Sequence, residues 1–280
     1  MYKCSYIIYI YNNEKTIPRV IDSLQKLNDG FFREFIVIDD GSTDGSLATL
    51  KQCITTLPKA TIITQEHIGP TLSIHKALGL AHGDYIHFVD GASSLTPNST
   101  KKLIECCQTM NCDAVFGNYT GTKAIAIASP TKEILENTIP LLRTIGLAGS
   151  LVNYNLLTQI KGIDGGIYTH NMSLSLECSI HTHFALCPEQ VSVNLNDQHE
   201  KIDIAFEIYN NLLATYNFSK IHQDIIPTYA RSLLFMLYKE VPSIRAKAFY
   251  LFKYFMLKFF KTPTIEDILN YYKYEIDKLF

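Results

Sequence analysis

Short apolar runs alternate with amphipathic segments along the N-terminal part of the chain. Runs rich in β-branched and aromatic residues occupy 4–11, 35–38, 61–64, 84–89 and 114–116, and each predicts a strand. Segment 14–27 carries apolar residues at 17, 20, 21, 24 and 27, which is helical spacing, and 70–81 predicts another helix. This alternation predicts an α/β fold with a mostly parallel sheet and helices on both faces.

Polar residues between these elements give the expected helix starts. Ser42 or Thr43 can cap the helix that follows the second strand, and Asp44 would then lie in its first turn, where the helix dipole favours a negative charge. Pro97 is placed to open a later helix within its first turn.

The ends of the predicted strands carry the candidate chemistry. In open parallel sheets, ligands bind at the carboxyl ends of the strands. The residues that we expect to be exposed there are Tyr11, Asn12, Asn13, Glu14, Asp39, Asp40, Asp90 and Gly91.

Two carboxylates in succession, Asp39 and Asp40, close the second strand. A carboxylate at this place can accept an N–H group from a bound heterocycle, and a nearby tyrosine ring can stack on that heterocycle. The same carboxylates can instead satisfy N–H groups of the turn. Both interpretations stay open on these residues alone.

The sequence from residue 198 onward differs in composition from the part before it. Helical stretches are separated at Pro227, Pro242 and Pro263, so we predict a helical C-terminal subdomain over 198–280 after a first domain over 1–197. Segment 244–261 combines lysines and an arginine with many aromatic residues and has no acid. It predicts either an interfacial membrane helix or a helix packed on the sheet or on a partner subunit.

Composition narrows the class of protein. The chain has 280 residues, of which 47% are hydrophobic and 19% charged, with a net charge of −2, so we expect no nucleic-acid partner. The seven cysteines show no paired metal-binding spacing, and Cys106, Cys107 and Cys112 are interpreted as packing residues. We see no signal peptide and expect a cytoplasmic protein, with membrane association at the cytoplasmic face as the alternative.

Three blocks of sequence resemble the GT-A glycosyltransferases of family 2: YIIYIYNNEKTIPRVIDSL, EFIVIDDGSTDGS and ALGLAHGDYIHFVDGAS. The later stretch IKGIDGGIY extends the resemblance, which covers roughly 3–195. It implies a Rossmann-like nucleotide-binding domain. The nucleotide-binding residues that it implies are Tyr9, Tyr11, Glu14, Asp39, Asp40, Asp90 and Gly91, with the second aspartate of the pair holding the base.

The chain departs from the family's pattern where the diphosphate would lie. The resemblance implies two aspartates one residue apart after the fourth strand, the last of which binds Mg²⁺ or Mn²⁺. Here Asp90 is present, but Ala92 stands in the third position and its methyl group cannot ligate a cation. A weak Mn²⁺ or Mg²⁺ site at Asp90 therefore stays an expectation. Ile74 and His75 stand where the family often has Arg and Asn.

The catalytic base also differs from the family's pattern. His170 and Asn171 replace the Glu-Asp pair that the resemblance implies. An imidazole can take a proton near neutral pH and an amide cannot, so His170 is the candidate base, with Asp164 and Glu177 as other candidates.

Two functions follow from these residues. The first is inverting transfer of a sugar from a nucleotide-sugar donor, expected to be UDP-linked, to a glycan or lipid-linked acceptor. The alternative is a degenerate, non-catalytic member of the family that acts as a binding or scaffold subunit, which Ala92 and Asn171 favour.

Overall fold

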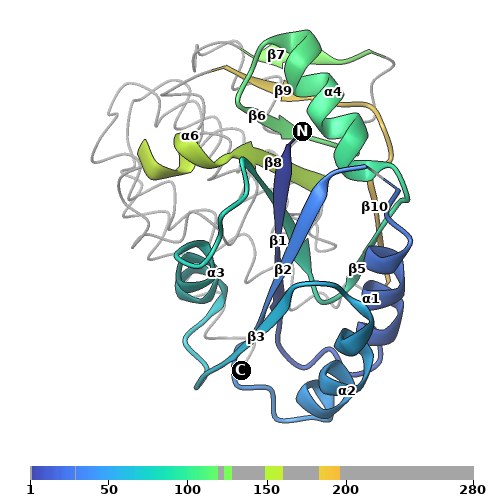
Figure 1. Ribbon diagram of the computed structural model, residues 1–280, viewed down its shortest axis with the longest axis vertical. Helices are drawn as coiled ribbons and strands as arrows, with labels where there is room; N and C mark the ends of the chain where they lie inside the picture. Colours follow the sequence, from blue (N-terminus) through green and yellow to red (C-terminus); the bar gives the residue numbers. More distant parts are fainter. Residues whose placement is uncertain (1, 29, 119–122, 128–148, 160–182, 196–280) are drawn as a thin grey trace, which may run out of the picture. The chain divides into compact units, whose positions relative to one another are not determined.

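The computed structural model describes residues 2–28, 30–118, 123–127, 149–159 and 183–195 (Figure 1). These residues belong to one compact unit, which comprises Met1–Ser129 and Thr144–Gln198. The predicted helical subdomain over 198–280, and the segment 244–261 within it, lie outside the described residues. The domain boundary therefore stays a prediction.

An eight-stranded sheet, in the order β3-β2-β1-β4-β8-β6-β9-β7, forms the centre of this unit. Its strands are β1 (Lys3–Ile10), β2 (Phe32–Asp39), β3 (Ala60–Thr64), β4 (Tyr85–Asp90), β6 (Ala114–Phe116), β7 (Ile125–Ile127), β8 (Ser150–Asn153) and β9 (Phe184–Leu186). The first four strands are parallel, whereas β8 runs antiparallel to both β4 and β6. A separate antiparallel pair joins β5 (Ser93–Leu95) to β10 (Ser192–Asn194). The prediction of a mostly parallel α/β sheet is confirmed.

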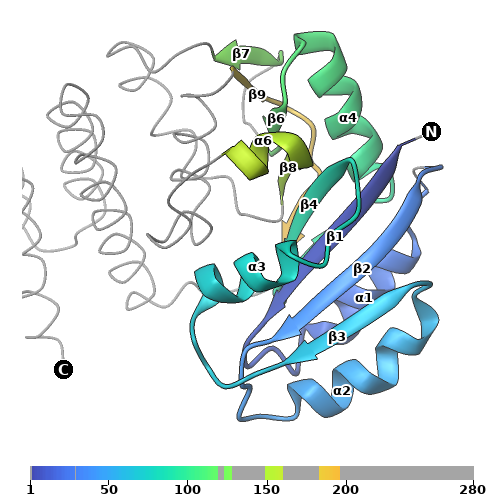
Figure 2. The ribbon, with the colours of Figure 1, turned by 60° about the vertical axis from the view of Figure 1, so that its left-hand side comes forward.

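Helices cover both faces of the parallel strands (Figure 2). They are α1 (Ile17–Gln25), α2 (Ser46–Cys53), α3 (Pro70–Leu78), α4 (Ser99–Met110) and the short α6 (Tyr154–Gln159). Helices α1 and α2 lie on one face, and α3 packs against β1 and β2 from the other. Among the described residues, no helix has the length and hydropathy needed to cross a bilayer.

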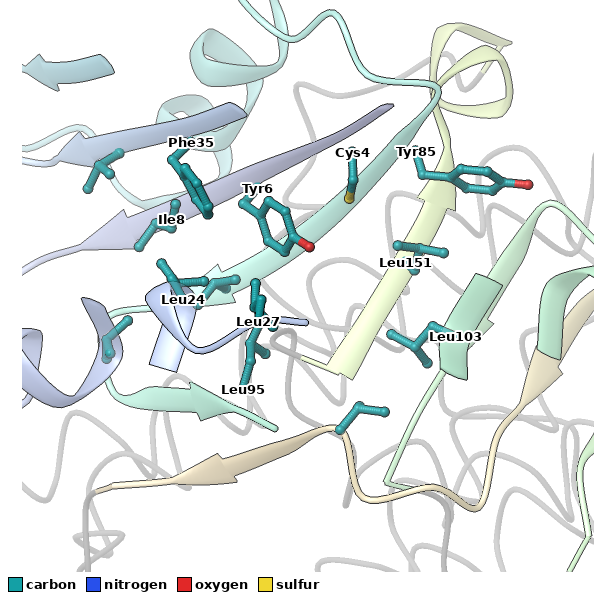
Figure 3. Packing of buried hydrophobic residues seen from close by; sticks show 14 of the residues in the cluster. Cys4, Tyr6, Ile8, Leu24, Leu27, Phe35, Tyr85, Leu95, Leu103 and Leu151 are labelled. Atoms are coloured by element: carbon teal, nitrogen blue, oxygen red, sulfur yellow. The ribbon is translucent and has the colours of Figure 1, made fainter. Parts of the chain in front are cut away.

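The main hydrophobic core lies on the α1 face of the sheet (Figure 3). Alternate residues of β1, including Tyr6 and Ile8, point into it because side chains alternate along a strand. Tyr6 stacks on Phe35 with ring centroids 5.0 Å apart. Each fully buried large side chain of this kind contributes about 1.5 to 3 kcal/mol. This packing fixes the strand ends at which a ligand would bind.

Helix starts differ from the predictions. Helix α2 begins at Ser46, so Ser42 and Thr43 do not cap it. Both residues bond Asn12 instead: the Ser42 hydroxyl accepts the Asn12 N–H, and the Thr43 N–H donates to the Asn12 side chain. Helix α4 begins at Ser99. A turn comes first, in which the Ser99 N–H donates to the Thr96 carbonyl, and Pro97 lies in this turn before the helix. Both predictions were wrong: contacts with Asn12, distant in sequence, set the turn before α2, and a local backbone turn precedes α4. The buried positions of Cys106 and Cys107 confirm their packing role.

Candidate nucleotide-binding site

The carboxyl ends of the four parallel strands lie at one edge of the sheet. The register pairs Tyr9 of β1 with Asp90 of β4, and Ile10 of β1 with Asp39 of β2. Asp39 is paired in turn with Thr64 of β3. The segments that follow these strands therefore start side by side, as parallel pairing requires.

Asp40 is the most fully hydrogen-bonded carboxylate at this edge. Its Oδ1 accepts the Gln65 side-chain amide at 2.8 Å and the Ile68 N–H at 3.0 Å. Its Oδ2 accepts the Gly69 N–H at 2.9 Å and the Tyr9 hydroxyl at 3.1 Å. Asp40 thus ties the segment between β3 and α3 to the ends of β1 and β2.

These contacts also set the charge of Asp40. Burial by itself raises the pKa of this carboxyl, but the hydrogen bonds from Ile68, Gln65, Ser73 and Tyr9 hold the pKa below its usual value. Burial, followed by the Asp40 charge, raises the pKa of Tyr9 far above that of a free phenol. Tyr9 therefore stays protonated and donates, and Asp40 stays an anion.

The adjacent carboxylate, Asp39, lies in a different environment. Alternation along β2 places Asp39 on the face of Phe35 and Val37, which belong to the main core. It is only 3% exposed, and its Oδ1 is buried without a hydrogen-bond partner among the described residues. The two carboxylates of the pair therefore differ in their contacts: Asp40 accepts several hydrogen bonds, whereas Asp39 packs at the main core.

Three residues that we expected to be exposed are buried instead. Asp39 and Asp40 have 3% and 0% exposure, and Gly91 is also buried. The chain itself supplies the cover: the segment after β3 closes over Asp40, and the Asn13 side chain lies where a Cβ on Gly91 would have to be. The sequence predicted the positions of the strand ends correctly, but the predicted exposure of these three residues was wrong.

An aromatic stack lies beside Asp40. The ring of Tyr11 is 4.2 Å from the imidazole of His67, with 24° between the planes. The His67 Nδ1 lies 3.0 Å from Asp40 Oδ2. Sequence reasoning missed His67 and Gln65, although both directly follow the predicted strand 61–64 and so fall at a carboxyl strand end by the same rule that identified Asp40.

The segment after β1 contacts both the end of β4 and the start of α2. The Asn13 side chain accepts the Tyr11 N–H, and the Asn13 N–H donates to Ser46 at the start of α2. Glu14 is exposed, and its carboxylate accepts the Gly45 N–H at 3.1 Å. A negative charge at this place stabilises the N-terminus of α2. Glu14 therefore has a capping contact in addition to its predicted role in nucleotide binding.

Asp90 ends β4 next to Tyr9. Its Oδ1 accepts the Ala92 N–H at 2.8 Å, and its Oδ2 accepts the Ser93 hydroxyl at 2.9 Å. Burial raises the pKa of Asp90, although both hydrogen bonds act in the opposite direction. The carboxylate is thus held in a fixed turn with Gly91 at its centre.

Oxygen ligands for a divalent cation are few at this edge. Within the described ranges, no group of three or more His, Cys, Asp and Glu side chains is placed to hold a metal ion. Asp90 offers two oxygens that are already acceptors, and Ala92 offers a methyl group. Mg²⁺ and Mn²⁺ at such sites take one or two carboxylates together with phosphate and water oxygens, so among the described residues Asp90 is the carboxylate that could hold the ion. No step proposed below depends on a metal.

Cations near the site come from α3. Lys76 donates to Gln65 Oε1 at 3.2 Å, and Gln65 is itself bonded to Asp40. His75 is exposed on the same helix, whereas Ile74 is 1% exposed and packs inward. The candidate base His170 and its alternatives Asp164 and Glu177 lie outside the described residues, and their roles stay predictions.

Residues 5–135 match the family model described as Glycosyl transferase family 2. This part of the chain is thus similar to glycosyl transferase family 2. The resemblance drawn from the three sequence blocks is therefore confirmed.

Among curated relatives, the cholesterol galactosyltransferase of Borreliella burgdorferi is 32% identical over 120 residues, which is 42% of this chain and 33% of that protein. The chain thus spans about a third of the length of this relative.

Solved structures agree with the GT-A fold. The chain resembles TarS 1–349 of S. aureus in complex with UDP-GlcNAc, with a TM-score of 0.58 at 16% identity, covering 91% of this chain and 81% of that chain. It also resembles the mannosyltransferase PcManGT of Pyrobaculum calidifontis in complex with GDP-Man and Mn²⁺, with a TM-score of 0.59 at 14% identity, covering 97% of this chain and 84% of that chain.

Proposed function

We propose that the chain is a glycosyltransferase that binds a nucleotide sugar at the carboxyl ends of β1, β2, β3 and β4. The observation that carries the proposal is the arrangement of Tyr11 and Asp40 at adjacent strand ends, inside the region that matches family 2. A flat ring and an acceptor that is charged at neutral pH are two groups that can hold a nucleobase.

The base that this arrangement favours carries a ring N–H. Uracil has one at the position that an Asp40 oxygen would accept, guanine has a comparable group, and cytosine has an unprotonated ring nitrogen there. The UDP-GlcNAc bound by TarS and the GDP-Man bound by PcManGT are consistent with such a base. We propose a UDP-linked donor, as the resemblance implies.

The reaction that we propose inverts the anomeric carbon. A hydroxyl of the acceptor attacks this carbon, the bond to the diphosphate oxygen breaks, and the hydroxyl proton passes to a base. We assign this base to His170, with Asp164 as the alternative. His75 and Lys76 on α3 are the described cations that can approach the diphosphate from the side of Gln65.

The acceptor that we propose is a glycan or a lipid-linked molecule. The name of the cholesterol galactosyltransferase describes a lipid acceptor for that relative. Transfer at the cytoplasmic face of a membrane, with peripheral contact through 244–261, would suit an acceptor of this kind.

A second candidate function is favoured by Ala92. With a methyl group in place of the family's last aspartate, and with both Asp90 oxygens engaged by the chain, a member that binds the donor without transferring sugar is the alternative.

Calorimetric titration with UDP, GDP, CDP and their common sugar conjugates tests donor binding, and release of UDP from a UDP-sugar tests transfer. We expect UDP to bind, CDP to bind weakly, and Asp40→Ala to weaken UDP binding by about 1 to 3 kcal/mol. The control is Asp22→Ala, which removes an exposed carboxylate on α1 paired only with Lys26. Binding without turnover would favour the non-catalytic function, and the absence of binding to every nucleotide would contradict both.

A further inference from the structure

His67 covers the proposed base site in a specific geometry. Its imidazole stacks on Tyr11, and its Nδ1 lies within 3.2 Å of two oxygens of Asp40, the carboxylate Oδ2 and the backbone carbonyl. Both oxygens are acceptors, so Nδ1 must carry the proton. The side chain of His67 is 50% exposed, whereas that of Asp40 is 0% exposed.

These two contacts are the same in kind as those proposed for a nucleobase. A uracil ring would stack on Tyr11 and bring its ring N–H to the Asp40 carboxylate. The imidazole already stacks on Tyr11 and holds Nδ1 3.0 Å from Asp40 Oδ2 while it bonds the Asp40 backbone carbonyl. We propose that His67 is an internal stand-in for the nucleobase, which the base of the donor displaces when it binds. This inference rests on the proposed function, because it needs a nucleotide as the displacing ligand.

The contacts of Asp40 identify His67 as the group that leaves. Asp40 Oδ2 accepts hydrogen bonds from the Gly69 N–H and the Tyr9 hydroxyl, whereas His67 Nδ1 bonds the Asp40 backbone carbonyl at 3.2 Å and lies 3.0 Å from Oδ2. Gly69 donates through the backbone, and Tyr9 is anchored on β1. The half-exposed imidazole is the donor that can move away with a side-chain rotation.

Replacement of His67 by a base leaves the site satisfied. The incoming ring N–H takes the place of His67 Nδ1 beside Oδ2, and the incoming ring restores the stack on Tyr11. The exchange also explains how a carboxylate with 0% exposure can be part of a binding site. Because the free protein must first give up the His67 contacts, its affinity for nucleotide is reduced by the fraction of molecules in which the site is covered.

Calorimetric titration of three proteins with UDP tests whether His67 occupies the nucleobase position in the free protein. They are the unmodified chain, His67→Ala and the control His82→Ala, which removes a histidine that is 72% exposed and 3.6 Å from Glu34. We expect His67→Ala to bind UDP about fivefold to tenfold more tightly, since the covered fraction no longer lowers the affinity. We expect His82→Ala to match the unmodified chain within about twofold, because its site residues are unchanged.

The outcomes separate this inference from the proposed function. If the unmodified chain binds UDP and His67→Ala binds equally or more weakly, the stand-in is overturned and the proposed function stands. If neither protein binds UDP, GDP or CDP, both are overturned.

A second measurement follows His67 directly. In the free protein, the Tyr11 ring should shift the His67 ring C–H resonance upfield in an NMR spectrum, and Tyr11→Leu should abolish this shift. Saturation with UDP should move the resonance to the range of the exposed His82. An upfield resonance that persists in the UDP-saturated protein would overturn the inference.

Discussion

At the scale of single residues, the pair Asp39 and Asp40 separates into two unlike groups. The sequence placed both carboxylates at a strand end, and this placement is correct because β-branched and aromatic residues predict the strand. The partners of Asp40 were not predictable in the same way. Gln65, Ile68 and Gly69 lie 25 to 29 residues away in the chain, and local patterns do not report contacts of this range.

The hydrogen bonds to Asp40 predict a large cost for removing its charge. Asp40→Asn should lower the free energy of unfolding by about 2 to 3 kcal/mol at pH 7, because the new amide would face the Gly69 N–H and the Tyr9 hydroxyl, which both donate. Asp39→Asn is the matched control and should cost less than about 1 kcal/mol, because Asp39 Oδ1 loses no hydrogen bond within the described part of the chain. Urea denaturation of both variants measures the difference.

The same comparison has a defined dependence on pH. The pKa of Asp40 is lowered in the folded protein, so its charge stabilises the fold above the ordinary carboxyl pKa of about 4. This stabilisation is lost as the pH falls through the lowered pKa. The gap between the unmodified chain and Asp40→Asn should therefore narrow from pH 7 toward pH 3, and a gap that stays constant would show that the charge of Asp40 is not what stabilises the fold.

Asp90 should behave in the opposite way. Burial raises the pKa of this carboxyl, so its charge costs stability at neutral pH, and that cost appears as the pH rises through the raised pKa. Asp90→Asn keeps an acceptor for the Ala92 N–H, and the Ser93 hydroxyl can turn to accept from the new amide. This variant should therefore unfold at a higher urea concentration than the unmodified chain at pH 7, with the advantage shrinking toward pH 4. A variant less stable than the unmodified chain at pH 7 would contradict the assigned direction of the shift.

At the scale of elements, the loops between strands and helices hold the site together. The periodicity of the sequence predicted the strands and α1 because one face of each is buried. It did not predict the start of α2, because distant side chains bond the groups that would otherwise cap it, or the start of α4, which follows a local backbone turn from Thr96 to Ser99. Asn12 forms hydrogen bonds with the Ser42 hydroxyl and the Thr43 N–H. The Glu14 carboxylate accepts the Gly45 N–H in place of a local cap.

The close approach of two loops predicts the effect of a change at Gly41. Its φ is +70°, and an added Cβ would lie 2.7 Å from the backbone nitrogen of His67. Gly30 has the same φ of +70° with nothing within 4 Å, so Gly30→Ala isolates the cost of the backbone conformation, about 1 kcal/mol. Gly41→Ala should cost at least about 2 kcal/mol more in urea denaturation, since the backbone near His67 must shift. Equal costs for the two variants would show that the loop after β3 moves freely.

At the scale of the whole molecule, the ends of the parallel strands differ in the functional groups that they carry. The β1 and β2 ends carry a stacked pair and a fully bonded anion, which suit a nucleobase, whereas the β4 end offers one carboxylate followed by Ala92. The family's pattern predicted Tyr11, Asp40 and Ala92 from sequence, because their positions depend on which residue follows which strand, whereas it did not predict His67. The candidate catalytic bases lie outside the described residues, and their roles stay predictions.

Ala92 predicts how the chain responds to a divalent cation. Because Ala92 offers no ligand and both Asp90 oxygens already accept hydrogen bonds from the chain, we expect UDP to bind the unmodified chain with the same affinity in Mn²⁺ and in EDTA, within about twofold. Ala92→Asp should gain about tenfold in UDP affinity in Mn²⁺ and lose this gain in EDTA, because it adds a second carboxylate beside Asp90 that can bind the cation between protein and diphosphate. The Ala92 backbone contacts, from its N–H to Asp90 and from Leu195 N–H to its carbonyl, do not depend on the side chain.

Ala92→Asn is the control for this comparison, since it has the size of aspartate without the charge, and it should show no gain in Mn²⁺. Calorimetric titration of the three proteins with UDP, each in Mn²⁺ and in EDTA, measures the effect. If the affinity of the unmodified chain falls sharply in EDTA, ligands outside the described residues hold the cation, and the methyl group of Ala92 is then no obstacle to metal-assisted transfer. If only Ala92→Asp responds, the single change at the third position accounts for the missing metal dependence.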